Sequence, residues 1–202
     1  MVKISDAGRM QAAVIAKPQQ IRLEEVSIPE PGPAEVRVRL EGCGVCASNI
    51  LLWEGRPWFE YPSRPGAPGH EAWGRIDALG RDVTGIAIGD RVALLSYRAF
   101  AQYDTAAADA VVRLPESFEG KPFPGEPLGC AMNVFRRSLI DPGQTVAIIG
   151  IGFLGALLTR LASQAGASVI AISRRPFALA IARDTRAAET ITMDDTGGSL
   201  KR

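Results

Sequence analysis

Histidine is nearly absent from this chain of 202 residues, in which His70 is the only one. Any function that needs an imidazole as a metal ligand or as a base must therefore use His70. Cysteine is also scarce. Three cysteines, two of them close together at Cys43 and Cys46, do not make a disulfide framework and fit a reducing compartment. We therefore expect a cytoplasmic protein.

Excess charge and long apolar runs are missing as well. The net charge of +1 argues against a general surface for nucleic acid or for anionic membranes. The longest nearly apolar run, residues 146–158, is too short to span a bilayer, which takes about 20 residues. Residues 1–17 hold no apolar segment of the kind found in signal peptides. We expect neither nucleic acid nor a membrane among the partners.

The first two thirds of the sequence predict a compact β domain, closed or nearly so. Short segments with apolar residues are separated by turns rich in Pro and Gly. Val36, Val38 and Leu40 alternate with arginines, for example, which is typical of a half-buried strand. The expected strands are 10–16, 21–28, 34–40, 72–79, 92–95, 99–103 and 110–114, and the expected helices are 49–53 and 126–139.

Cys43 and Cys46 lie in a glycine-containing turn that leads into the first expected helix. The glycines let the backbone turn tightly and bring Cys46 and Ser48 to the start of that helix. A helix N-terminus lowers the pKa of a thiol and favours a thiolate that binds zinc. The C-x2-C spacing also permits a redox pair or half of a structural zinc site, although a redox pair usually adjoins a βαβ unit. We expect Cys43 to pack in the core.

His70 lies in the pattern G-H-E-x2-G-x5-G-x2-V, which begins at Gly69 and ends at Val83. Taken alone, a histidine at the mouth of a strand fits a structural role, with its ring hydrogen-bonded to backbone. The six fixed positions of the pattern are much more specific than a lone glycine motif. The pattern resembles the signature of the zinc-containing medium-chain alcohol and polyol dehydrogenases.

Two further segments extend that resemblance. The segment around Cys46 and Ser48 resembles the one in which the family's cysteine binds the catalytic zinc and its hydroxyl begins a proton relay. Asn49 departs from the family's aspartate, which orients the zinc-bound histidine. Glu126, in a Glu-Pro-Leu segment, resembles the glutamate of the polyol and threonine dehydrogenases that takes the place of a third zinc cysteine. Cys130 is its rival, because four residues separate the two and place them on one helix face.

The resemblance thus implies one catalytic zinc, bound by residues from the set Cys46, His70, Glu71 and Glu126. Ser48 is the candidate proton relay. Glu71 is a second candidate catalytic residue, which either binds the metal directly or orients the site. Many relatives carry a lobe with four closely spaced cysteines that holds a structural zinc, whereas this chain has no cysteine at residues 96–98. We therefore expect no structural zinc.

A nucleotide-binding motif follows in the last third of the chain. The apolar run 144–149 is typical of a buried parallel strand, and it leads directly into G-x-G-x-x-G and then into leucines at helical spacing. Strand, glycines and helix in this order indicate dinucleotide binding, although a tight turn without a ligand is the plain alternative. The residues expected to contact the cofactor are Gly150, Gly152, Phe153, Leu154, Gly155, Ser173, Arg174 and Arg175.

The choice of cofactor depends on the end of the next strand, expected over 168–172. A domain specific for NAD has Asp or Glu there, which accepts from the ribose 2′-OH. Here Arg174 and Arg175 follow Ser173, and two guanidinium groups suit a 2′-phosphate. The sequence predicts NADP, with NAD and a pair of merely solvated arginines as the alternatives. A helix over 177–186 and a strand over 190–193 complete β-α-β-α-β.

The expected fold class is α/β plus β. A GroES-like β domain over residues 1–140 is followed by the first half of a Rossmann doubly wound domain over residues 141–202. The resemblance implies a zinc-dependent oxidoreductase that transfers a hydride between a small secondary alcohol, polyol or sugar-derived, and NADP. A zinc-free reductase of the same superfamily and an inactive nucleotide-binding remnant are the alternatives.

The dinucleotide domain also sets an expectation about completeness. The doubly wound order is 3-2-1-4-5-6, and the sequence supplies only strands 1 to 3. Strand 1 is then expected at an exposed edge. We expect a truncated form that binds adenosine phosphates weakly without appreciable hydride transfer. For a complete chain the resemblance implies a homo-oligomer.

Overall fold

The computed structural model describes residues 8–193 and 200–201. The chain divides into two compact units, which are Met1–Glu126 and Pro127–Arg202. Helix α2 (Gly125–Arg137) begins at the end of the first unit and continues into the second. The domains predicted from the sequence, 1–140 and 141–202, place their boundary after this helix. We describe each unit by itself.

Five strands of the first unit form an antiparallel sheet in the order β6-β3-β4-β5-β7. Their bounds are β3 (Glu35–Gly44), β4 (Glu71–Leu79), β5 (Arg91–Leu94), β6 (Tyr103–Ala107) and β7 (Val111–Arg113). The core of the unit lies on one face of this sheet, where Val36, Val38 and Val92 are fully buried. The half-buried strand predicted over 34–40 is therefore confirmed, and it extends to Gly44.

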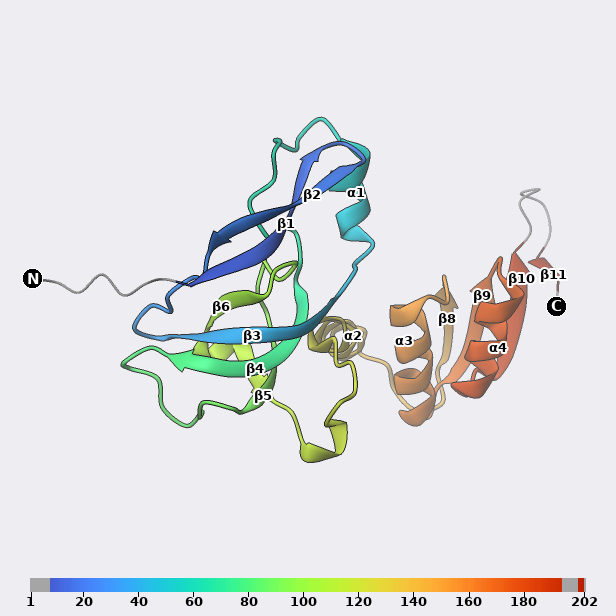
Figure 1. Ribbon diagram of the computed structural model, residues 1–202. Helices are drawn as coiled ribbons and strands as arrows, with labels where there is room; N and C mark the ends of the chain where they lie inside the picture. The colour runs from blue at the N-terminus through green and yellow to red at the C-terminus, as the bar shows by residue number, and fades with distance from the viewer. Residues whose placement is uncertain (1–7, 194–199, 202) are drawn as a thin grey trace, which may run out of the picture. The chain divides into compact units, whose positions relative to one another are not determined.

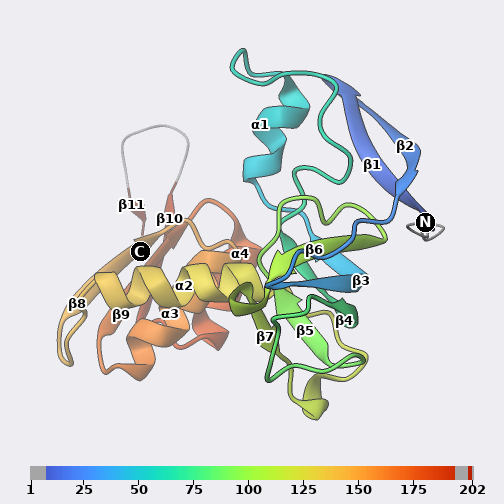
Figure 2. The same ribbon diagram turned by 90° about the vertical axis from the view of Figure 1, so that its left-hand side faces the viewer.

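A separate hairpin and a short helix complete the ordered elements around this sheet (Figures 1 and 2). The hairpin pairs β1 (Arg9–Lys17) with β2 (Gln20–Ser27), and the helix is α1 (Ser48–Glu54). The backbone N–H of Gln19 donates to the carbonyl of Trp53 at 2.9 Å, which ties the hairpin turn to the end of α1. These three elements confirm the predictions over 10–16, 21–28 and 49–53. Two short 3-10 helices follow β6 and β7, at Ala108–Ala110 and Glu116–Phe118.

The strand predicted over residues 99–103 is wrong. The ladder begins only at Tyr103, with β6, because the backbone of residues 99–102 bonds to three different segments, which are 66–69, 11–13 and Leu40. The N–H of Phe100 donates to Gly66 and its carbonyl accepts from Ala13, while Ala101 forms an isolated bridge to Ala12. Apolar periodicity does not distinguish such a segment from a strand.

The second unit holds a parallel sheet of the kind that the sequence predicts. Its order is β11-β10-β9-β8, and β8, β9 and β10 run parallel. Helices α3 and α4 both contact β9 and each other, so they cover the same face. If the three parallel strands β8, β9 and β10 are numbered 1, 2 and 3, they lie in the sheet in the order 3-2-1, as in the first half of a Rossmann domain. The bounds are β8 (Thr145–Ile149), α3 (Phe153–Gln164), β9 (Ser168–Ser173), α4 (Pro176–Asp184), β10 (Glu189–Met193) and β11 (Leu200–Lys201).

Strand β8 lies at the edge of this sheet, as the topology argument predicts. The interpretation of its apolar run as a fully buried strand is wrong, because within the described residues β8 pairs only with β9. Thr145, Ala147 and Ile149 are exposed, and Val146 and Ile148 are half-buried. None of the helices within the described ranges has the length and apolar character needed to cross a membrane.

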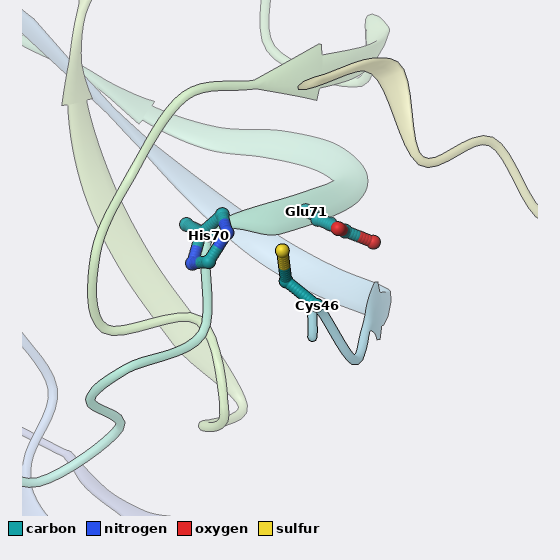
Figure 3. Close-up of side chains that lie close together, drawn as sticks. All are labelled: Cys46, His70 and Glu71. Atoms are coloured by element: carbon teal, nitrogen blue, oxygen red, sulfur yellow. The ribbon is translucent and has the colours of Figure 1, made fainter. Parts of the chain in front are cut away.

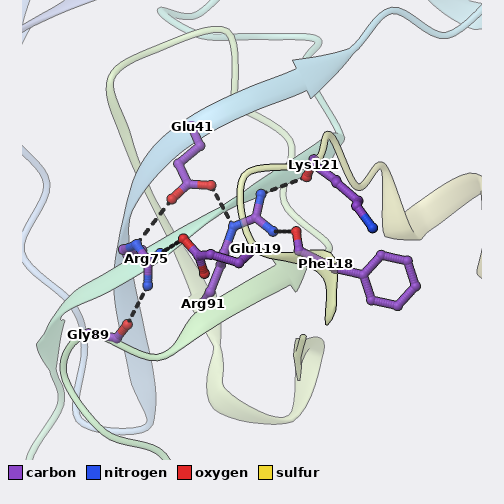
Figure 4. Close-up of polar contacts among 7 residues, drawn as sticks. All are labelled: Glu41, Arg75, Gly89, Arg91, Phe118, Glu119 and Lys121. Carbon is purple, nitrogen blue, oxygen red and sulfur yellow. Dashed lines mark hydrogen bonds and ion pairs between the residues drawn. The ribbon is translucent and has the colours of Figure 1, made fainter. Parts of the chain in front are cut away.

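An arginine-centred polar cluster fastens the loop before α2 to the first unit's sheet (Figure 4). The side chain of Arg91, on β5, is only 6% exposed, and its Nε lies 2.7 Å from Glu41 Oε2. Its other nitrogens donate to the carbonyl oxygens of Phe118 and of Lys121, the latter at 2.7 Å. Glu41 also pairs with Arg75 at 3.2 Å. One buried guanidinium thus satisfies two loop carbonyls and a carboxylate.

Arg91→Ala should lower the free energy of unfolding of the first unit by about 2–4 kcal/mol, because it leaves a carboxylate and two carbonyls without their buried donor. Urea unfolding followed by tryptophan fluorescence measures this, since Trp53, Trp58 and Trp73 all lie in the first unit. Arg113→Ala is the matched control. Its side chain is 63% exposed and 3.8 Å from Asp90, so we expect less than about 1 kcal/mol. Equal losses in the two variants would contradict this interpretation.

Candidate metal centre and nucleotide site

Three potential metal ligands from separate parts of the sequence meet in the first unit (Figure 3). They are the thiol of Cys46, the imidazole of His70 and the carboxylate of Glu71. The pairing of β3 with β4 brings them together, because Gly44, the last residue of β3, is the partner of Glu71, the first residue of β4. Cys46 follows the end of one strand and His70 precedes the start of the other.

The three donor atoms lie within 4.8 Å of one another. Around a tetrahedral zinc, bond lengths of 2.0–2.3 Å place ligand atoms about 3.6 Å apart, so small side-chain movements would close the cluster. Glu71 is 9% exposed, and Cys46 and His70 are half-buried. Thiolate, imidazole and carboxylate form a donor set that zinc accepts.

The ring of His70 is oriented by the backbone. Its Nδ1 lies 2.8 Å from the carbonyl oxygen of Pro68, and a carbonyl can only accept, so Nδ1 carries the proton in the neutral ring. The lone pair of Nε2 is then available to a metal. The hydrogen bond from the ring to the backbone, expected for a histidine with a purely structural role, is thus present. A histidine that binds a metal through Nε2 also needs such a bond at Nδ1.

Gly44 leaves room for the carboxylate of Glu71. A Cβ atom at Gly44 would overlap the Glu71 carboxylate on the neighbouring strand. The glycines of this turn therefore serve close approach as well as the tight turn expected from the sequence. Cys43 packs against the core, as predicted, and burial raises the pKa of its thiol to about 11. Cys43 is consequently protonated at neutral pH and unsuited to bind a metal.

The remaining residues predicted for this site lie in different surroundings. Ser48 is exposed as the first residue of α1, two positions after Cys46. Asn49 is 8% exposed, with its side chain directed at backbone groups on either side of the cluster. Glu126 lies in the first turn of α2 and does not belong to the group of three, while Cys130 is half-buried on the same helix. Their predicted metal roles remain predictions.

A cavity of about 490 Å³ lies in the second unit at the carboxyl ends of the parallel strands. Ligands bind at this end of doubly wound sheets. Five of the predicted cofactor residues line it, namely Gly150, Gly152, Ser173, Arg174 and Arg175. Ile149, Ile151 and Met193 also line it. Sequence reasoning did not single these three out, although Ile149 and Met193 end predicted strands and strand ends could have indicated them.

The three glycines of the turn differ in conformation and in the space around them. Gly150 has φ +90°, a left-handed conformation that favours glycine. A Cβ at Gly155 would overlap the carbonyl oxygen of Gly150, so this glycine allows α3 to pack on the turn. Gly152 has φ −95°, and a Cβ there would meet no protein atom within 4 Å. Neither conformation nor packing requires glycine at Gly152, whereas a ligand that approaches the backbone would.

The charged side chains that line the cavity are those of two arginines. Arg174 and Arg175 follow β9 and are exposed, and the N–H of Arg175 donates to Ser173 Oγ at 3.3 Å. Of the described residues that line the cavity, none is Asp or Glu. Phe153 and Leu154 open α3, are 56% and 41% exposed, and are not among the lining residues. The charge around this cavity is that of a site for an anionic group.

Comparison with known proteins identifies relatives among the dehydrogenases. Residues 32–116 match the family model of the alcohol dehydrogenase GroES-like domain. An alcohol dehydrogenase of Moraxella sp. (strain TAE123) is 32% identical over 93% of this chain and 64% of its own length. An erythritol/L-threitol dehydrogenase of Mycolicibacterium smegmatis is 29% identical over 94% of this chain and 67% of its own.

Among solved structures, a candidate zinc-binding dehydrogenase of Sinorhizobium meliloti 1021 bound to NADP superimposes with a TM-score of 0.78. It is 29% identical, and the match covers 95% of this chain and 64% of that one. The chain therefore spans about 60% of the length of the curated relatives that it matches.

The contrast between two glycines of the turn can be tested directly. Gly155→Ala should loosen the β8–α3 turn, because overpacking of this kind costs about 1–3 kcal/mol. Gly152→Ala should leave local stability unchanged within about 0.5 kcal/mol and weaken NADPH binding about tenfold or more, because the new methyl group meets only the ligand. Amide hydrogen exchange of peptides from residues 145–164 measures the first effect and titration with NADPH the second. Equal exchange in the two variants would contradict the assignment.

Proposed function

Since the chain belongs to the family of alcohol and polyol dehydrogenases that contain a GroES-like domain, we propose that it is a zinc-dependent oxidoreductase that uses NADP. Its substrate class is small secondary alcohols, polyol or sugar-derived. The observation that carries the proposal is the convergence of Cys46, His70 and Glu71 in the first unit. The first unit holds the catalytic residues and the second unit binds the nucleotide.

The metal ligands are Cys46, His70, Glu71 and Glu126. Cys46 binds through its thiolate and His70 through Nε2, which the bond from Nδ1 to Pro68 leaves available. The carboxylates of Glu71 and Glu126 would exchange as the third ligand, so that three protein groups bind at a time and one position remains open to substrate. When bound, zinc supplies a Lewis acid that lowers the pKa of the substrate hydroxyl.

Ser48 takes the proton that the substrate hydroxyl releases. Its hydroxyl can accept and donate a hydrogen bond, and its exposed position two residues after Cys46 gives it access to solvent. Glu71, nearly buried and adjacent to His70 in the chain, contributes a carboxylate to the cluster, a ligand type that zinc accepts. When bound, the nicotinamide of the cofactor would supply the acceptor for the hydride of the alcohol carbon.

The nucleotide binds along the glycine turn of the second unit. Its pyrophosphate approaches the backbone of Gly152 and faces the N-terminus of α3. Arg174 and Arg175 pair with the 2′-phosphate at the end of β9. The comparison structure solved with NADP supports this choice of cofactor.

Elemental analysis of chain purified without chelator should give about one zinc per chain, as one catalytic site requires. His70→Ala removes the only imidazole and should abolish the bound zinc. Glu126→Ala should retain less zinc than Cys130→Ala if Glu126 is the ligand of the pair. Equal zinc in wild type and His70→Ala would refute the metal site. A zinc-free wild type that binds NADPH would point to a zinc-free reductase.

Fluorescence titration should show tighter binding of NADPH than of NADH. Arg174→Ala should narrow that preference about tenfold or more, because one charge-assisted contact to a phosphate contributes about 1.5–3 kcal/mol. Arg136→Ala, which removes the same charge from an exposed site on α2, is the control and should leave the preference unchanged. A wild type that prefers NADH would overturn the cofactor assignment.

A further inference from the structure

Two side chains converge on one backbone carbonyl behind the metal ligands. The carbonyl oxygen of Pro68 lies 2.8 Å from Nδ1 of His70 and 3.2 Å from Nδ2 of Asn49. The other end of the Asn49 side chain, Oδ1, accepts from the backbone N–H of Cys46 at 3.0 Å. Asn49 is 8% exposed, so these bonds are shielded from water. A single amide thus touches the backbone of one metal ligand and the hydrogen-bond acceptor of another.

The chemistry of its neighbours fixes which way the amide points. A backbone N–H can only donate, so the Asn49 atom that faces Cys46 must be the oxygen. A carbonyl can only accept, so the atom that faces Pro68 must be the nitrogen. Pro68 has two lone pairs and two donors, one from Asn49 and one from His70, so its acceptor capacity is used in full.

We propose that Asn49 is a positioning residue that sets the tautomer and direction of His70 through the Pro68 carbonyl, and that aspartate cannot replace it in this chain. The inference rests on the proposed metal site. It concerns a residue that lies outside the group of three ligands and bonds to the backbone on which two of them depend.

An aspartate at position 49 would keep the bond from the Cys46 N–H but would place a carboxylate oxygen against the Pro68 carbonyl. Two acceptors 3.2 Å apart in a nearly buried site repel each other, and neither carries a proton to bridge them. The carbonyl would turn away from the carboxylate and cease to accept from Nδ1 of His70. The ring would then lose the partner that keeps its Nε2 lone pair directed at the cluster.

The first test reads the tautomer of His70 in metal-free protein. Because His70 is the only histidine, every imidazole signal in a long-range proton–nitrogen correlation spectrum belongs to it. In the neutral ring of the wild type, the proton should reside on Nδ1 alone, where it is donated to the Pro68 carbonyl. Asn49→Asp should give a mixture of tautomers or the form protonated on Nε2. A wild-type ring protonated on Nε2 would overturn the proposal, whether or not any variant folds.

The second test measures zinc affinity by competition with a chromophoric chelator. Asn49→Asp should lower the affinity about tenfold to a hundredfold, the effect of losing an outer partner of a metal ligand. Asn49→Ala, which removes both hydrogen bonds without adding a charge, should show a loss in the same direction. Asn133→Asp is the matched control, because Asn133 is the other asparagine of the chain and is exposed on α2. It should bind zinc as the wild type does.

The outcomes separate this inference from the proposed function. The proposal is overturned if Asn49→Asp keeps both the wild-type zinc affinity and a ring protonated on Nδ1. That result would show that the aspartate carboxylate accepts the hydrogen bond from Nδ1 of His70 directly. A wild type that binds no zinc refutes the metal site itself, and the tautomer spectra of the metal-free proteins still decide whether Asn49 orients His70.

Discussion

The pairing of β3 with β4 is the interaction on which the candidate metal centre depends. It ends at the Gly44–Glu71 partnership, so the two residues that follow β3 and the residue that precedes β4 must lie side by side. Val36, Val38 and Ile76 are fully buried and anchor the register from the other end. A slip of one residue would turn these side chains to the opposite face, and for that reason the core of the sheet also specifies the positions of Cys46 and His70.

Much of this arrangement could be predicted from the sequence. The predicted strands and helices of both units are found, except the strand over 99–103, because local periodicity is strong in short half-buried strands and in the leucine-rich helix. Cys46, His70 and Glu71 were predicted as ligands and do meet. The prediction over residues 99–102 failed because their backbone bonds to three separate segments, and pairing across long sequence distances leaves no local signature.

The hydrogen bonds of Arg91 and Asn49 could not be predicted from the sequence, because their partners are also distant along the chain. Arg91 occupies a buried strand position where periodicity favours an apolar residue, and only the structure shows two loop carbonyls and Glu41 around it. The partners of Asn49 are backbone groups, which are the same in every sequence. The sequence gives only the resemblance, from which Asn49 departs, and the donor and acceptor directions become visible only once Pro68 and Cys46 are placed.

The two proposed sites share one chemical feature, which is a side chain that offers hydrogen-bond donors. At Asn49, an amide stands where the resemblance implies a carboxylate, and one of its partners is a carbonyl, which can only accept. At Arg174 and Arg175, guanidinium groups stand where an NAD site would have a carboxylate, and the proposed partner is a phosphate that also needs donors. In each case the side chain offers a donor to a group that can only accept, although Asn49 also accepts from the backbone N–H of Cys46 through its Oδ1. The hydrogen-bond polarity of the partner is therefore a constraint on which residue can stand at such a position.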